Sequence, residues 1–139
     1  MLTVDASVWV AAGNPNDIFA ERSREFLAVA ARQGEIFCAP SFVEVEVACA
    51  LARRWQDSEA GREWVRSILV KPGITTVPVD AALLAFALYL GPKFLLRAGD
   101  ALYVAVSMIY SAPLITWDAE LTGRAGAITP SDWLVKNAA

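Results

Sequence analysis

Three aspartates stand at positions where a parallel α/β fold gathers its functional groups. Asp5 comes directly after Leu2-Thr3-Val4, Asp118 comes shortly after Leu114-Ile115-Thr116, and Asp100 stands at a predicted helix start. In such folds, ligands bind beyond the carboxyl ends of the strands, near the point where the strand order reverses. Carboxylates that converge there repel one another unless a cation lies between them, and Mg²⁺ prefers oxygen ligands. The pattern indicates a hard divalent metal ion that orients a phosphodiester and activates water for its hydrolysis.

Each of these aspartates also has a purely structural interpretation. Asp5 fits a turn or a helix cap, and Asp118 precedes Ala-Glu-Leu, which is typical of a helix start. Asp100 can cap its own helix, because free N–H groups and the helix dipole favour a carboxylate there. No single aspartate is specific, and only the set of three favours a metal site.

The chain contains no histidine, which removes several classes of hydrolytic enzyme. Catalysis by Ser-His-Asp or Cys-His groups, histidine acid–base cleavage of RNA and histidine-ligated zinc are all excluded. Any hydrolysis by this protein must therefore depend on carboxylates and, we expect, on a hard metal ion.

The charge and the cysteines limit partners and location. A net charge of −3 argues against binding a nucleic acid duplex through one broad basic face, although a metal can mask clustered acids. Cys38 and Cys49 have no metal-type or redox spacing, so we expect two buried, reduced cysteines in a cytoplasmic protein. The N-terminus lacks a basic leader, and the uncharged run 101–117 is short for a membrane span, so we expect no membrane segment.

The elements that must position the acids alternate between strands and helices. The high hydrophobic content, 56%, favours a parallel sheet covered by helices on both faces. Residues 2–4 and 8–10 flank Asp5-Ala-Ser7, a pattern that predicts a short buried strand ending at a polar tip. We therefore predict a single α/β sandwich domain over residues 1–139. Further strands are predicted near 36–38, 75–79, 114–116 and 127–129, and helices over 18–33, 58–70 (with Ser58 as its N-cap), 80–90 and 98–111, after 118 and from 130.

Four stretches of this chain resemble, in order, the four motifs of PIN-domain ribonucleases. They are Val4–Trp9, Pro40–Leu51, Gly99–Ala105 and Leu114–Leu121. Each stretch is weak evidence alone, but each holds an acid, and together they cover essentially the whole chain. Their order, their spacing and the chain length are most similar to VapC-type toxins of toxin–antitoxin pairs.

The resemblance implies a fold, an activity and partners. The implied fold is a three-layer sandwich with a five-stranded, mostly parallel sheet between helices, commonly as a homodimer. The implied activity is a Mg²⁺- or Mn²⁺-dependent endoribonuclease that leaves a 3′-hydroxyl and a 5′-phosphate and cuts structured RNA such as tRNA or rRNA. A VapB-type antitoxin would be its inhibitor.

The resemblance also implies which residues form the site. Carried over by motif, the catalytic and metal-binding acids are Asp5, Glu46, Asp100 and Asp118. Ser7 and Thr116 match positions where the family often has a hydroxyl that supports the site. Two positions depart from the family without touching the acids: Cys49 stands where asparagine is common, and Trp117 stands where a small or polar residue is usual.

The stretch Phe42-Val-Glu-Val-Glu-Val47 alternates like a strand, but we predict that it begins a helix. Pro40 ends the preceding strand, and Ser41 with Glu44 forms a capping box. At about 100° per residue, Glu44 and Glu46 lie roughly 200° apart, so they cannot share a site. We expect Glu46, on the face of Phe42 and Arg53, to be the carboxylate on the metal side.

In-line attack on a phosphodiester also needs cations near the phosphate and a group to handle the proton. Candidates for the phosphate are Arg53, Arg54 and Arg97, although each is also compatible with a solvated surface charge. Either Asp100 or Asp118 could orient the attacking water. The five tryptophans, among them Trp117, could stack on bases, but most of them are expected in the core or at an interface.

Three other classes of protein share parts of this pattern. A haloacid-dehalogenase-type phosphatase also starts with a strand-tip aspartate, but it needs a second acid where this chain has Ser7. A phospho-accepting receiver domain needs a lysine after a late strand, and none of the lysines stands there. A PIN fold that binds RNA or protein without catalysis is the main alternative, which the intact acids argue against.

Overall fold

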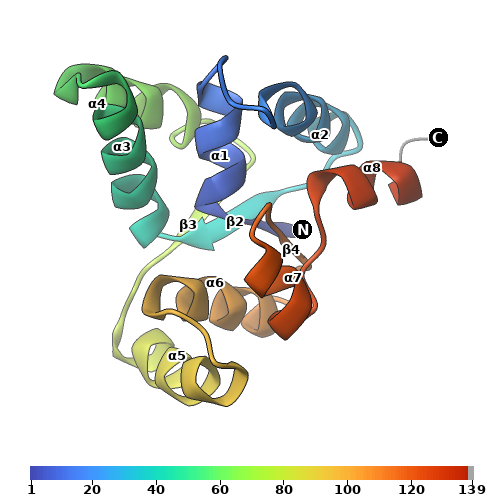
Figure 1. Ribbon diagram of the computed structural model, residues 1–139. Helices are drawn as coiled ribbons and strands as arrows, with labels where there is room; N and C mark the ends of the chain where they lie inside the picture. Colours follow the sequence, from blue (N-terminus) through green and yellow to red (C-terminus); the bar gives the residue numbers. More distant parts are fainter. Residues whose placement is uncertain (138–139) are drawn as a thin grey trace.

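A four-stranded parallel sheet forms the centre of the molecule in a computed structural model, which describes residues 1–137 (Figure 1). The predicted domain end at residue 139 lies outside this range. The order across the sheet is β3-β2-β1-β4. The strands are β1 (Leu2–Val4), β2 (Phe37–Pro40), β3 (Ile74–Val77) and β4 (Leu114–Ile115). The helices are α1 (Ala6–Gly13), α2 (Ala20–Arg32), α3 (Phe42–Trp55), α4 (Ser58–Ile68), α5 (Ala81–Phe94), α6 (Ala98–Ile109), α7 (Ala119–Ala125) and α8 (Pro130–Asn137).

The strand order reverses between β1 and β4. From β1 the chain first adds β2 and then β3 on one side, and it later returns to the other side of β1 to form β4. Thr3 pairs with Leu114 and Val4 pairs with Ile115, so the two strands end level with each other. The residues that follow them therefore emerge side by side at the edge where ligands bind in such folds.

The predicted parallel α/β sandwich is confirmed, with one difference in the sheet. The fifth predicted strand, residues 127–129, forms only an isolated parallel bridge between Ile115 and Ile128. The Ile128 N–H donates to the Leu114 carbonyl at 2.9 Å, and the Thr116 N–H donates to the Ile128 carbonyl at 3.0 Å. Because α8 begins at Pro130, the run ends before a longer ladder can form.

Helices cover both faces of the sheet and give three layers (Figure 1). On one face, α6 contacts β1, β2 and β4, and α5 packs on the outer side of α6. On the other face lie α1 and α3, which contact each other, with α2 against α1 and α4 against α3. Val4, Ile115 and Val106 have no exposed surface, so the core lies between the sheet and the inner helices.

Residues 8–10, for which the sequence predicts no element of their own, belong to helix α1. The helix starts immediately after Asp5, which is its N-cap residue. Val8, Trp9, Ala11 and Ala12 are all buried, since α1 is covered by α2 and α3 as well as by the sheet. A helix buried on most of its sides shows no helical periodicity in its sequence, and its short apolar run looks like a strand.

The N-cap of α4 is also one residue earlier than predicted. The Asp57 side chain accepts hydrogen bonds from the N–H groups of Glu59 at 3.0 Å and Ala60 at 3.2 Å. Ser58 is therefore the first residue of the helix rather than its cap.

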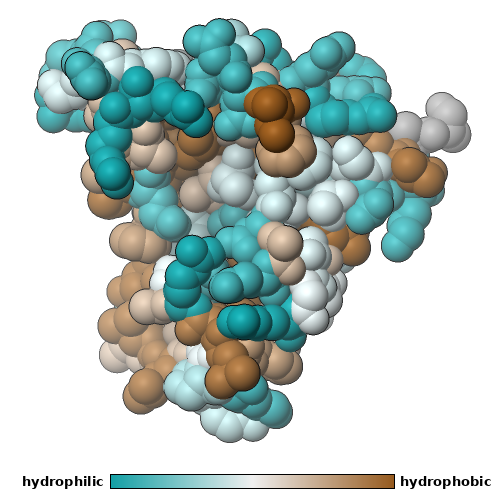
Figure 2. All heavy atoms as spheres, in the orientation of Figure 1, coloured by the Kyte–Doolittle hydropathy of each residue, from teal (hydrophilic) through white to brown (hydrophobic). Residues whose placement is uncertain are grey.

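Helix α5 and the residue that ends it carry an exposed apolar surface. Leu84, Leu88, Tyr89 and Leu95 are all exposed, and the lower part of the molecule in Figure 2, where Figure 1 places α5, is largely brown. Within residues 1–137, no single helix is long and apolar enough to cross a membrane. The pair α5 and α6 reaches that length and composition together but is bent by 110° at the break.

Candidate active site

The four predicted acids line one pocket at the carboxyl ends of β1 and β4. The pocket has a volume of about 410 Å³. Asp5 follows β1, Asp118 follows β4, Asp100 lies in the first turn of α6 and Glu46 comes from α3. Its lining residues are Asp5, Ala6, Ser7, Phe42, Glu46, Arg97, Gly99, Asp100 and Asp118. The switch point of the sheet therefore brings together acids that lie far apart in the chain.

Asp5 is the most deeply buried of these acids, with 6% of its surface exposed. Its Oδ2 accepts a hydrogen bond from the Thr116 hydroxyl at 2.8 Å and a longer one from the Ser7 N–H at 3.4 Å. Burial raises the pKa of the Asp5 carboxyl, and hydrogen bonds from Ser7 and Thr116 oppose this rise. A cation beside Asp5 would favour its ionised form.

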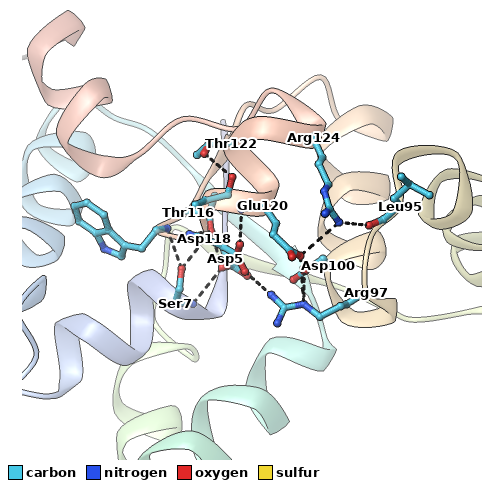
Figure 3. A network of polar contacts seen from close by, with 12 residues as sticks. Asp5, Ser7, Leu95, Arg97, Asp100, Thr116, Asp118, Glu120, Thr122 and Arg124 are labelled. Atoms are coloured by element: carbon cyan, nitrogen blue, oxygen red, sulfur yellow. Dashed lines mark hydrogen bonds and ion pairs between the residues drawn. The ribbon is translucent and has the colours of Figure 1, made fainter.

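The hydroxyl groups of Ser7 and Thr116 connect Asp5 to the residues after β4 (Figure 3). The one hydroxyl proton of Thr116 goes to Asp5, so in the 3.3 Å contact between Thr116 Oγ1 and Ser7 Oγ the serine is the donor. Ser7 Oγ in turn accepts from the Trp117 N–H at 3.1 Å, and Thr116 Oγ1 accepts from the Asp118 N–H at 3.0 Å. These bonds fix Asp5 and the turn that carries Asp118 relative to each other.

Glu46 is held by Tyr103, a residue for which the sequence analysis gave no role. The Tyr103 hydroxyl donates to Glu46 Oε1 at 2.7 Å, and Tyr103 itself is fully buried. Burial raises the pKa of Glu46, the Tyr103 hydrogen bond lowers it, and the charges of Asp5 and Asp100 raise it further. Burial and the Glu46 charge raise the pKa of Tyr103, so the phenol stays protonated as a donor. Its position three residues after Asp100, on the same side of α6, is a sequence signal that could have found it.

Glu44 and Glu46 are separated as predicted, but the capping box is wrong. Glu44 is exposed, whereas Glu46 lines the acid pocket together with Phe42. Ser41 has helical backbone angles, and its side chain makes no capping hydrogen bond. Its N–H instead donates to the Val77 carbonyl at 2.7 Å, which extends the pairing of β2 with β3. Glu44 therefore has no free N–H of Ser41 to accept from.

Arg97 bridges two of the acids across the mouth of the pocket (Figure 3). Its Nε lies 3.1 Å from Asp100 Oδ2, and its Nη2 lies 2.5 Å from Asp118 Oδ2. Burial raises the pKa of Asp100, and the hydrogen bond and charge of Arg97 oppose that rise. Glu120 lies at 4.0 Å from Arg97 Nε and 3.7 Å from Arg124, so the ion pairs continue along α7.

Arg53 and Arg54 do not reach the pocket. They lie in the last turn of α3, are exposed, and are not among its lining residues. Seven residues of helix separate Glu46 from Arg53, which corresponds to about 10 Å along the axis. Of the three arginines predicted near the phosphate, the structure brings only Arg97 to the acids.

The donor set fits a hard divalent cation in chemistry, although the acids are spread apart. Within residues 1–137, no three acids lie close enough together to form a ready-made metal site. All four pocket acids offer carboxylate oxygens, the ligands that Mg²⁺ and Mn²⁺ accept. The Arg97 guanidinium lies between Asp100 and Asp118 and reduces the repulsion between their charges. A cation bound at the same place would have the same effect. A metal ion bound by the Oδ2 atoms of both Asp100 and Asp118 would have to displace Arg97 from them.

The similarity to solved structures is extensive in fold and low in sequence. The structure of Mycobacterium tuberculosis VapC20, a sarcin-ricin loop cleaving toxin, matches with a TM-score of 0.79 at 20% identity, over 92% of this chain and 97% of that one. PAE2754 from Pyrobaculum aerophilum matches with a TM-score of 0.72 at 21% identity, over 99% of this chain and 88% of that one. VapBC2 from Rickettsia felis, bound to a DNA fragment from their promoter, matches with a TM-score of 0.70 at 14% identity, over 92% and 96%.

The sequence itself also matches a known family. No curated protein sequence matches the chain significantly. The family model of the PIN domain matches residues 2–126, which include all four pocket acids, Ser7 and Thr116. This chain therefore belongs to the PIN-domain family.

Proposed function

We propose that this protein is a Mg²⁺- or Mn²⁺-dependent endoribonuclease and the toxin of a VapBC-type toxin–antitoxin pair. The observation that carries the proposal is the convergence of Asp5, Glu46, Asp100 and Asp118 on one pocket at the switch point of the sheet. Two of the similar solved structures are described as a toxin and as a toxin–antitoxin complex. The proposed substrate is a structured RNA, cut to leave a 3′-hydroxyl and a 5′-phosphate.

The side chains of the pocket have distinct parts in this reaction. The four acids would hold the metal ion, which supplies a Lewis acid for the phosphodiester when it is bound. The Thr116 hydroxyl orients the Asp5 carboxylate, with Ser7 behind it, and the Tyr103 hydroxyl orients that of Glu46. The chain has no histidine, and in this proposal a pocket carboxylate accepts the proton of the attacking water.

Asp100 and Asp118 are the candidates for that proton, because both lie at the open side of the pocket with Arg97. Asp100 is only part-buried, and Asp118 also caps α7 by accepting from the Glu120 N–H at 2.8 Å. When Arg97 leaves these two carboxylates, its guanidinium remains beside the pocket, where it can pair with a phosphate oxygen.

The proposed partners are an RNA substrate, a VapB-type antitoxin and a second copy of the chain. The exposed apolar surface of α5 supports an interface with a protein partner, since large apolar patches on soluble domains commonly mark such surfaces. Both cysteines are free; Cys38 is buried as expected, whereas Cys49 is exposed. Two free thiols support the proposed cytoplasmic location.

A nuclease assay with a matched pair of variants tests the activity. The purified chain, free of any inhibitor, should cut RNA in Mg²⁺ or Mn²⁺ and not in EDTA, and Asp5→Ala should abolish cleavage. Glu46→Gln should lose activity, whereas Glu44→Gln, on the same helix but exposed, should retain it. Cleavage by Asp5→Ala, or equal loss in both glutamate variants, contradicts the proposal.

The second candidate function is an RNA- or protein-binding module without catalysis. The ion pairs of Arg97 with Asp100 and Asp118 favour it, because they already neutralise part of the acid cluster without a metal. Well-folded protein that binds RNA but cuts none of several RNA pools in Mn²⁺ would establish this alternative.

A further inference from the structure

A second cavity, lined by an aromatic pair, opens beside the acid pocket. It has a volume of about 450 Å³ and shares Ala6, Ser7, Glu46 and Asp118 with the acid pocket. Because the two cavities share these walls, a chain whose phosphate lies among the acids has the second cavity as neighbouring space. Phe19 and Trp117 belong to the second cavity alone.

The two rings are stacked and held in place. Their centroids lie 4.1 Å apart with an angle of 9° between the planes. The Trp117 indole N–H donates to Ser23 Oγ at 2.8 Å, and Ser23 has no exposed surface. The Phe19 N–H donates to Asp17 Oδ1 at 2.8 Å, which fixes the loop before α2. The aromatic wall is therefore preorganised in the free protein.

The position of Trp117 ties this wall to the reacting groups. Trp117 stands in the chain between Thr116, which orients Asp5, and Asp118, and its own N–H donates to Ser7 Oγ at 3.1 Å. Phe19 keeps 36% of its surface exposed, so the stack still offers aromatic surface to a ligand. Neither the core nor the proposed metal chemistry accounts for this exposure.

We propose that Phe19 and Trp117 form a base-stacking subsite for an unpaired nucleotide next to the scissile phosphate. The inference rests on the proposed ribonuclease function and deepens it: the RNA must present a base free of pairing at that position. Every base has a π-face that stacks on aromatic side chains, and the sugar–phosphate chain connects that base directly to the acid pocket. An RNA base is favoured over a protein side chain because the cavity is continuous with the pocket that the phosphodiester must enter.

A binding cycle between side chain and base tests the subsite. The RNA is an oligonucleotide that contains a site cut by the protein, or the tightest-binding oligonucleotide if none is cut. A series of copies is made, each of which lacks the base at one different position. Binding is measured in Ca²⁺ with Asp5→Asn present, so that the RNA stays intact. Phe19→Ala should weaken binding of the complete oligonucleotide roughly 5- to 150-fold, the range for losing one base–aromatic stack. It should cause no further loss when the one contacted base is already missing.

Two variants control for the fold and for apolar surface in general. Phe19→Tyr keeps an aromatic ring and should bind like the parent protein. Ile18→Ala removes the adjacent apolar side chain, which is 88% exposed and does not line the cavity, and should have no effect.

The outcomes separate this inference from the proposed function. The subsite is overturned if Phe19→Ala binds the complete oligonucleotide as tightly as its parent does. It is also overturned if Phe19→Ala weakens RNA binding by the same factor wherever the abasic position stands. Both results count against the subsite even if the wild type cuts RNA. If Phe19→Ala weakens binding of an inhibitor protein but leaves RNA binding unchanged, the subsite is also overturned. The aromatic pair Phe19–Trp117 is then part of an interface with a protein. If RNA binds with the predicted coupling at one base but is never cut, the subsite stands and the ribonuclease function fails.

Discussion

Removing the hydroxyl of Tyr103 should loosen Glu46 while the helix packing stays intact. Phenylalanine keeps the buried ring of Tyr103, and only the 2.7 Å hydrogen bond to Glu46 Oε1 is lost. A hydrogen bond to a charged group contributes about 1.5–3 kcal/mol. Because Glu46 is only part-buried, water can replace the lost donor. We therefore expect a loss at the lower end of that range, about 1.5 kcal/mol, or slightly more than a tenfold change in the unfolding equilibrium.

A double-mutant cycle in urea, on metal-free protein at pH 7, isolates the charge of Glu46. Glutamine at position 46 can still accept from Tyr103, but a neutral hydrogen bond is roughly half as strong. Tyr103→Phe should therefore cost about half as much free energy of unfolding in the Glu46→Gln background as in the wild type. The affinity for Mn²⁺, measured by calorimetry, should fall about 10- to 100-fold in Tyr103→Phe, as expected when the hydrogen-bond partner of a metal ligand is removed.

Two results would refute this reasoning. Equal cost of Tyr103→Phe in both backgrounds would show that the Glu46 charge does not matter to the contact. An unchanged affinity for Mn²⁺ in a variant with the expected loss of stability would show that the bond supports the fold and not the site.

Three further predictions concern other parts of the fold. Burial raises the pKa of the Asp5 carboxyl above its ordinary value of 3.8, so the folded chain binds this proton more tightly than the unfolded chain. The free energy of unfolding of the metal-free protein should therefore rise as the pH falls from neutral toward 3.8. Asp5→Asn should flatten that rise in urea titrations. Gly61→Ala should lower the free energy of unfolding by about 1–2 kcal/mol, because the new Cβ would lie 2.5 Å from the Ala48 carbonyl oxygen of α3, while Gly123→Ala, with open space around it, should cost nothing in the same assay. Glu44→Ala should change thermal stability by less than about 0.5 kcal/mol, since the capping box is absent; a larger loss would mean that Glu44 has a partner after all.

The sequence predicts the acids at the sheet edge well because their signals are local. Asp5 and Asp118 follow short apolar runs, and Asp100 stands at a helix start, so each could be placed from its immediate neighbours. The alternating pattern around Glu46 was assigned to a helix, and the structure has that helix as α3.

The features that the sequence could not predict depend on contacts between distant segments. The Ser41 N–H pairs with Val77, which no local pattern reveals. Arg97 reaches Asp118, 21 residues further along the chain. Phe19 stacks on Trp117, which lies 117 − 19 = 98 residues further along the chain. Such contacts are set by the strand order, and a single sequence does not reveal which strands become neighbours.

Because Arg97 bridges Asp100 and Asp118, loading of the proposed metal at these two carboxylates would be an exchange of cations rather than a simple addition. A guanidinium with one positive charge would leave Asp100 and Asp118, and an ion with two positive charges would arrive. The positive charge paired directly with these two carboxylates would then change by only one unit. The occupancy of the proposed site would follow the concentration of free divalent ions. Arg97 would compete with those ions for the two carboxylates, and its effective concentration is constant because it belongs to the same chain.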